Sequence, residues 1–108
     1  MARDILEQHA ELNATIMTVD GARTREEVEA GIARLIEAFK TKPTRNVIVD
    51  IREAVYDQPI EDIIKDWSLV AALLPPANVA LVHSEKTVTP AFATVGALEA
   101  SNHCAEAF

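Results

Sequence analysis

Apolar and polar positions mix in two short segments at the start of the chain, residues 3–10 and residues 13–20. The second segment carries the run Thr15-Ile16-Met17-Thr18-Val19, which is typical of a β-strand. Only Glu11 and Leu12 separate the two segments. The pattern therefore predicts that the chain opens with a β-hairpin.

A helix is predicted next, from Thr24 to about Lys42. Thr24 is suited to cap the first turn, and Glu27 is suited to reach back to the Thr24 backbone, as in a capping box. Apolar residues then recur every three or four positions on one stripe, which comprises Val28, Ile32, Leu35, Ile36 and Phe39. Pro43 marks the end of this helix.

Two further helices are predicted from the same spacing. The first begins around Pro59, with Asp57 as its cap, and ends at Pro75-Pro76. Its apolar face comprises Ile60, Ile63, Ile64, Trp67, Val70, Ala71 and Leu74. The second is expected to begin with Thr89 as its cap and Pro90 in its first turn, and to carry Phe92, Val95 and Leu98.

Aliphatic runs between these helices, at residues 46–51 and 78–83, predict two inner strands covered on both faces. Residues 103–108 begin to alternate and predict a last strand at a sheet edge. Helical connections of this length imply right-handed crossovers and parallel pairing. We therefore expect a single α/β domain over residues 1–108, with the order ββαβαβα(β) and a mixed sheet whose parallel centre is covered by helices.

This order of elements resembles the STAS-like proteins related to bacterial anti-sigma-factor antagonists. The segments that carry the resemblance are Asn46-Val47-Ile48-Val49-Asp50-Ile51-Arg52-Glu53-Ala54 and Asn78-Val79-Ala80-Leu81-Val82. The resemblance covers most of the chain and implies a sandwich in which helices cover one side of the sheet. It also implies a protein that works by binding other proteins and, in some members, small ligands or lipids.

One feature of the antagonists is missing from this sequence. In those proteins a phosphorylatable serine opens the helix after the central strand, and its phosphate disrupts docking to a kinase partner. The corresponding stretch here reads Val55-Tyr56-Asp57-Gln58-Pro59-Ile60 and contains no Ser or Thr. The resemblance therefore implies the scaffold without the phosphoserine switch.

Charge and cysteine usage narrow the classes of partner. Seventeen acidic residues against ten Lys and Arg give a net charge of −7, the wrong sign for a nucleic-acid partner. The longest apolar stretch, residues 68–80, is too short to span a bilayer, so we expect no transmembrane segment and a cytoplasmic location. The single cysteine, Cys104, excludes an internal disulfide and is expected to be a small core residue.

A crevice is predicted where the two inner strands end, because α/β proteins bind ligands beyond the carboxyl ends of parallel strands. It is expected to contain Asp50, His83 and Ser84. For Asp50 we expect a structural role, through pairing with Arg52 or capping the loop. His83 and Ser84 are neighbours on a strand and point to opposite faces, which argues against a nucleophile and its base. We expect no catalytic residues, no metal and no cofactor.

An interaction surface is predicted on the second helix and the loop before it. Leu69 and Leu73 fall beside the core-facing stripe and broaden the apolar surface, either as an exposed flank or as a face that a neighbouring helix covers, while Trp67 is expected in the core. The predicted surface comprises Arg52, Tyr56, Asp57, Leu69 and Leu73. The acidic residues of this region are interpreted as a solvated rim, namely Glu53, Asp57, Glu61, Asp62 and Asp66.

Three functions remain open from the sequence. The first is a non-enzymatic interaction or regulatory module whose partner is another protein or a second copy, as a homodimer. The second is a carrier or sensor of a small apolar ligand held between helices and sheet, because the chain is rich in aliphatic residues and poor in aromatic ones. The third is an enzyme with dispersed catalytic residues such as Arg52, Tyr56 and His83.

Overall fold

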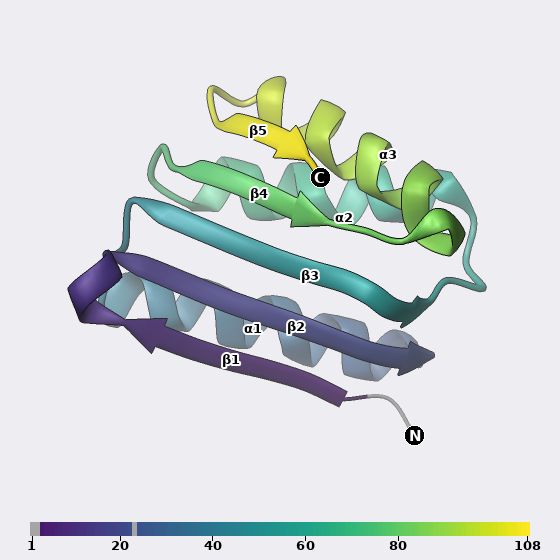
Figure 1. The fold of residues 1–108 in the computed structure, drawn as a ribbon, viewed down its shortest axis with the longest axis horizontal. Helices are drawn as coiled ribbons and strands as arrows, with labels where there is room; N and C mark the ends of the chain where they lie inside the picture. Colours follow the sequence, from purple (N-terminus) through teal and green to yellow (C-terminus); the bar gives the residue numbers. More distant parts are fainter. Residues whose placement is uncertain (1–2, 23) are drawn as a thin grey trace.

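Five strands and three helices alternate along the chain in a computed structural model that describes residues 3–22 and 24–108 (Figure 1). Two short 3-10 turns, Ala10–Leu12 and Glu85–Thr87, connect some of them. The elements are β1 Arg3–His9, β2 Ala14–Ala22, α1 Arg25–Thr41, β3 Asn46–Val55, α2 Ile60–Leu73, β4 Asn78–Val82, α3 Val88–Glu99 and β5 Cys104–Ala107.

The strands form one mixed sheet in the order β1-β2-β3-β4-β5. β1 runs antiparallel to β2, which confirms the predicted hairpin, and the other neighbours are parallel. In the register, Ile16 lies opposite Ile48 and Ile48 lies opposite Ala80. The α/β class and the order of elements are therefore as the sequence predicted, with β5 at the edge of the sheet.

Helices cover one face of this sheet. Val47, Val49 and Ile51 of β3 are at most 2% exposed and belong to a core that also contains residues of α1, α2 and α3. Ile48 and Asp50, which alternate with them, are only half-buried. The prediction that the inner strands are covered on both faces is therefore wrong. Because every parallel crossover in this strand order turns the same way, the helices gather on one side.

The start of α1 follows the prediction, while the starts of α2 and α3 do not. The Glu27 amide donates to Thr24 Oγ1, and the Thr24 amide donates to Glu27 Oε1 at 2.9 Å, which completes the capping box. At α2 the cap residue is Pro59, without a side-chain hydrogen bond, so Asp57 is not the cap. At α3 the 3-10 turn runs directly into the helix at Val88, so Thr89 lies inside the helix.

Phe92 and Cys104 both lie on the surface, which corrects the core position that the sequence predicted for Cys104. Phe92 of α3 is 61% exposed, and its ring lies 6.1 Å from that of His83 between centroids. Cys104 is exposed at the start of β5. Its strand neighbours Ala105 and His103 are buried instead, because successive side chains of a strand point to opposite faces.

His103 links the end of α2 to the loop that follows it, inside the protein. It is 5% exposed, its Nε2 lies 2.8 Å from the Ala71 carbonyl oxygen, and its Nδ1 accepts from the Ala77 amide at 3.3 Å. The Ala71 carbonyl lies in the last turn of α2, where the helix itself supplies no donor. A neutral imidazole with its proton on Nε2 satisfies both backbone groups.

Candidate functional site

The uncovered face of the sheet has an apolar centre. Because directly opposed residues share a face, the register aligns one side chain from each of three strands across it. The half-buried apolar residues there are Ile16, Ile48, Ala80 and Val82. Ile5 and Phe108, at the two margins, are 39% and 63% exposed. The described chain therefore leaves a largely apolar band in contact with water.

Two shallow hollows interrupt this face. One, of about 300 Å³, lies over β3, β4 and β5, and its lining includes Ile48, Ala80 and Phe108. The other, of about 280 Å³, lies over β1, β2 and β3, and its lining includes Ile5 and Thr18. Concave apolar surface of this kind accommodates protruding side chains of a partner better than a flat face does.

Acidic groups surround the apolar band. Glu7 and Glu106 lie opposite Ile16 and Ala80 on the two outer strands, and Asp20 and Glu53 line the second hollow. Arg52 also lies on this face, but the Asp50 carboxylate accepts hydrogen bonds from its Nε at 3.0 Å and its Nη2 at 2.8 Å. These bonds from Arg52 are the largest cause that lowers the pKa of Asp50. The rim of the face is thus acidic.

The residues predicted to share a crevice do not converge. Asp50 lies on the uncovered face and pairs with Arg52, which is one of the contacts expected for it from the sequence. His83 turns to the helix side, where it contacts Phe92, and its Nδ1 lies 3.0 Å from the Ser84 carbonyl oxygen. Ser84 Oγ donates to the Arg52 carbonyl oxygen and accepts from the Lys86 amide. The arrangement stabilises the ends of β3 and β4.

The surface predicted around α2 is divided by the sheet. Leu69 and Leu73 are 54% and 56% exposed, so they form an exposed flank and not a face covered by a neighbouring helix. Arg52, however, lies on the uncovered face of the sheet, while α2 lies on the other side (Figure 1). Tyr56 is half-buried against the helices, and Asp57 is exposed in the loop between β3 and α2. The five residues therefore do not form one continuous surface.

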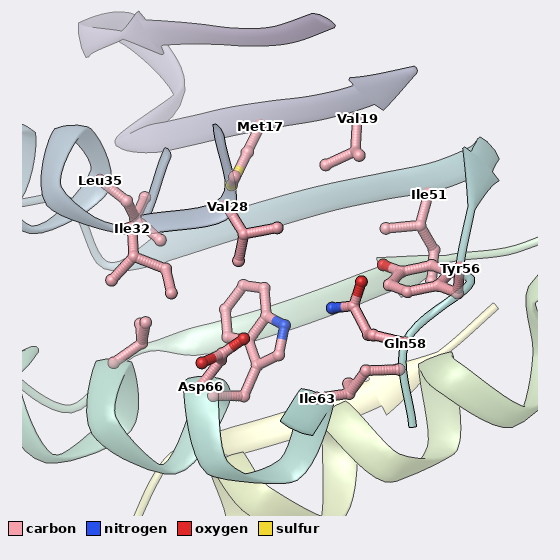
Figure 2. A pocket seen from close by; sticks show the side chains of 12 residues that line it. Met17, Val19, Val28, Ile32, Leu35, Ile51, Tyr56, Gln58, Ile63 and Asp66 are labelled. Atoms are coloured by element: carbon pink, nitrogen blue, oxygen red, sulfur yellow. The ribbon is translucent and has the colours of Figure 1, made fainter. Parts of the chain in front are cut away.

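A narrow cleft lies between the sheet, α1 and α2 (Figure 2). Its walls are mainly aliphatic, and the lining residues are Met17, Val19, Val28, Ile32, Leu35, Ile51, Tyr56, Gln58, Ile63, Asp66, Trp67 and Val70. Gln58 projects its amide from the loop before α2 toward the space between Tyr56 and Asp66 (Figure 2). Trp67 is half-buried, so it lines this cleft where the sequence predicted a core position.

Asp66 does not belong to the solvated acidic rim that the sequence predicted. It is 7% exposed, and its carboxylate accepts two hydrogen bonds of 2.8 Å from the guanidinium of Arg25 in α1. The spacing indicates this burial weakly, because Asp66 lies three positions after Ile63 and four before Val70, on the core-facing side of α2. Nothing in the sequence indicates that Asp66 pairs with Arg25, which lies 41 positions earlier in the chain.

The part of the chain that the structure describes has neither a cluster of metal ligands nor a helix that could span a membrane. Within residues 3–22 and 24–108, no three His, Cys, Asp or Glu side chains gather as metal ligands do. None of the helices described there has the length and apolarity needed to cross a bilayer. A comparison of the sequence with protein-family models gives no match, and a comparison with curated proteins gives none either.

Proposed function

We propose that this chain is a non-enzymatic, STAS-like binding module whose uncovered sheet face docks another protein. The observation that carries the proposal is the apolar band of that face, which extends from Ile16 through Ile48 to Ala80 and Val82. Contiguous apolar surface exposed to water is a common mark of an interaction site. Scattered exposed residues such as Leu69 and Leu73 are common on any protein and argue less strongly.

Charge defines the kind of partner. The acidic groups around the band favour a partner that is apolar in the middle and basic at its rim. A second copy of the chain fits less well, because a two-fold axis through this face brings acidic rim against acidic rim. The net charge of −7 adds to that repulsion at low ionic strength. The proposed occupant is therefore a different protein with Lys or Arg around an apolar patch.

The test compares two variants that remove one aliphatic side chain each. Ile48→Gln places an amide at the centre of the band, and Leu69→Gln makes the same kind of change on the outer side of α2. A binding protein is first captured with the wild-type chain and identified, and its affinity for purified wild type and both variants is then measured by calorimetry. We expect Ile48→Gln to weaken binding by about tenfold or more, as loss of a central apolar contact does, and Leu69→Gln to leave it unchanged.

Two results contradict the proposal. The first is an affinity that falls with Leu69→Gln and is unchanged with Ile48→Gln, which moves the interface to α2. The second is a wild-type dimer in sedimentation experiments that Ile48→Gln converts to a monomer, which makes the second copy the occupant. Circular dichroism of both variants establishes that the fold is intact in each comparison.

A further inference from the structure

The cleft between α1 and α2 is narrow, partly open to solvent and not filled. It holds about 20 Å³ of free space, which is room for one water molecule. α2 and α3 pack closely along their length, whereas direct contacts between α1 and α2 are sparse. Separation of α1 from α2 therefore disturbs less packing than separation of α2 from α3. Beyond the Arg25–Asp66 pair at the first turn of α1, the cleft is therefore the place where the helical layer has the least packing to lose.

The lining combines a long apolar wall with two unused hydrogen-bonding groups. Val28, Ile32 and Val70 belong to the apolar wall. The Gln58 amide and the Trp67 indole N–H, both half-buried, make no hydrogen bond to the described part of the chain. Pockets for small molecules are typically built in this way, with apolar walls and few polar groups that orient the ligand.

The charges of the lining exclude an ionised ligand. Asp66 is the carboxylate of the cleft, and its two oxygens are occupied by Arg25. Outside the cleft, the neighbouring Asp57 and Asp62 add negative charge, which disfavours an anion. A cation that enters the cleft finds no free counter-charge there, and burial of an unpaired charge is costly. An uncharged head group, by contrast, can form hydrogen bonds with the Gln58 amide and the Trp67 indole N–H.

We infer that this cleft binds a small uncharged amphiphile, a slender aliphatic chain that ends in a hydroxyl or carbonyl group. The chain lies between Val28, Ile32 and Val70 when the part of α1 beyond its first turn moves away from α2, with the Arg25–Asp66 pair kept, and the head group binds Gln58 and Trp67. This site lies on the helix side of the sheet, so it is separate from the face proposed to dock a protein.

Trp67 provides a direct probe, because it is the single tryptophan of the chain and lines the cleft. Purified protein is titrated with 1-octanol while Trp67 emission is recorded. We expect a saturable blue shift as the alkyl chain displaces water from the indole. Octanoate and octylamine have the same chain with a charged head and are expected to bind at least about tenfold more weakly. Equal affinity for the three compounds overturns the inference, as does an emission that does not saturate with 1-octanol.

Matched variants locate the bound molecule. Ile32→Phe fills the cleft, whereas Ile36→Phe makes the same change one turn later on α1, at a half-buried position outside the lining. We expect Ile32→Phe to abolish the 1-octanol response and Ile36→Phe to retain it. A response that is equal in both variants contradicts the assignment to this cleft.

Gln58→Leu tests the head group without change to the helices. Because Gln58 is a half-buried loop residue, this variant remains informative if Ile32→Phe fails to fold. Loss of one neutral hydrogen bond predicts that 1-octanol binds roughly fivefold more weakly. Native mass spectrometry of the wild type with 1-octanol checks the stoichiometry, for which one molecule per chain is expected. An unchanged affinity of Gln58→Leu, or several molecules per chain, contradicts the site.

Discussion

The guanidinium of Arg25 and the carboxylate of Asp66 form a bidentate ion pair, with Nη1 and Nη2 each 2.8 Å from one carboxylate oxygen. The pair joins the first turn of α1 to the middle of α2. Its two sides differ in environment, because the Asp66 side chain is 9% exposed and that of Arg25 is 54% exposed. The hydrogen bonds to Asp66 are the largest cause that raises the pKa of Arg25 above its ordinary value.

The unequal burial predicts unequal effects of mutation. Arg25→Met leaves a buried carboxylate without its cation, whereas Asp66→Asn leaves a guanidinium that water solvates. We expect Arg25→Met to lower the free energy of unfolding more than Asp66→Asn, and the double variant to be more stable than Arg25→Met alone. Urea unfolding of the three variants measures this order. A larger loss for Asp66→Asn is incompatible with the observed geometry.

His103 is predicted to be important for stability and not for chemistry. His103→Ala leaves the Ala71 carbonyl and the Ala77 amide without their partners in a buried site. Each unmade hydrogen bond and the space left behind contribute, so we expect a loss of about 2–4 kcal/mol in thermal or urea unfolding. His83→Ala is the control, with an expected loss below about 1 kcal/mol, because His83 is half-exposed. Similar losses for both histidines contradict this interpretation.

The two threonines that the sequence marks as helix caps are predicted to differ. Thr24→Ala removes the hydroxyl that accepts from the Glu27 amide and is expected to cost about 1 kcal/mol of unfolding free energy. Thr89→Ala changes an exposed residue inside α3 and is expected to stay within about 0.5 kcal/mol of wild type. Urea unfolding under one set of conditions compares them. A cost for Thr89→Ala that equals the cost for Thr24→Ala shows that α3 begins at a different residue.

The Asp50–Arg52 pair predicts a measurable shift in acid titration. Because the folded state lowers the pKa of Asp50 below the reference value of 3.8, the ionised carboxylate contributes stability above that value. This contribution is lost as the pH falls through the lower pKa of the folded state. We expect Arg52→Gln to raise the Asp50 midpoint toward 3.8 in a carbon-13 carboxyl titration. Lys65→Gln removes a distant cation and is expected to leave the midpoint unchanged; equal shifts in both variants would indicate a general field effect.

Local patterns in the sequence were sufficient for much of the fold. The stripe from Val28 to Phe39 and the capping box at Thr24 predict α1, since a helix start depends on residues three or four positions apart. The run from Asn46 to Ile51 predicts β3 because its consecutive β-branched residues are also a local pattern. The caps of α2 and α3 were predicted wrongly, because Asp57 and Thr89 are suitable cap residues but the backbone turns at Pro59 and Thr87.

The candidate sites depend on relationships that no local pattern contains. The sequence by itself determined the order of the elements, and it indicated that Leu69 and Leu73 lie beside the core-facing stripe and that Asp50 pairs with Arg52 or caps the loop. Only the tertiary structure decided that one face of the sheet stays uncovered, that Arg52 and α2 lie on opposite sides of it, and that Asp66 meets Arg25. The physical reason is distance along the chain: alternation and helical periodicity report which side chains share a face, whereas the fold decides what covers that face.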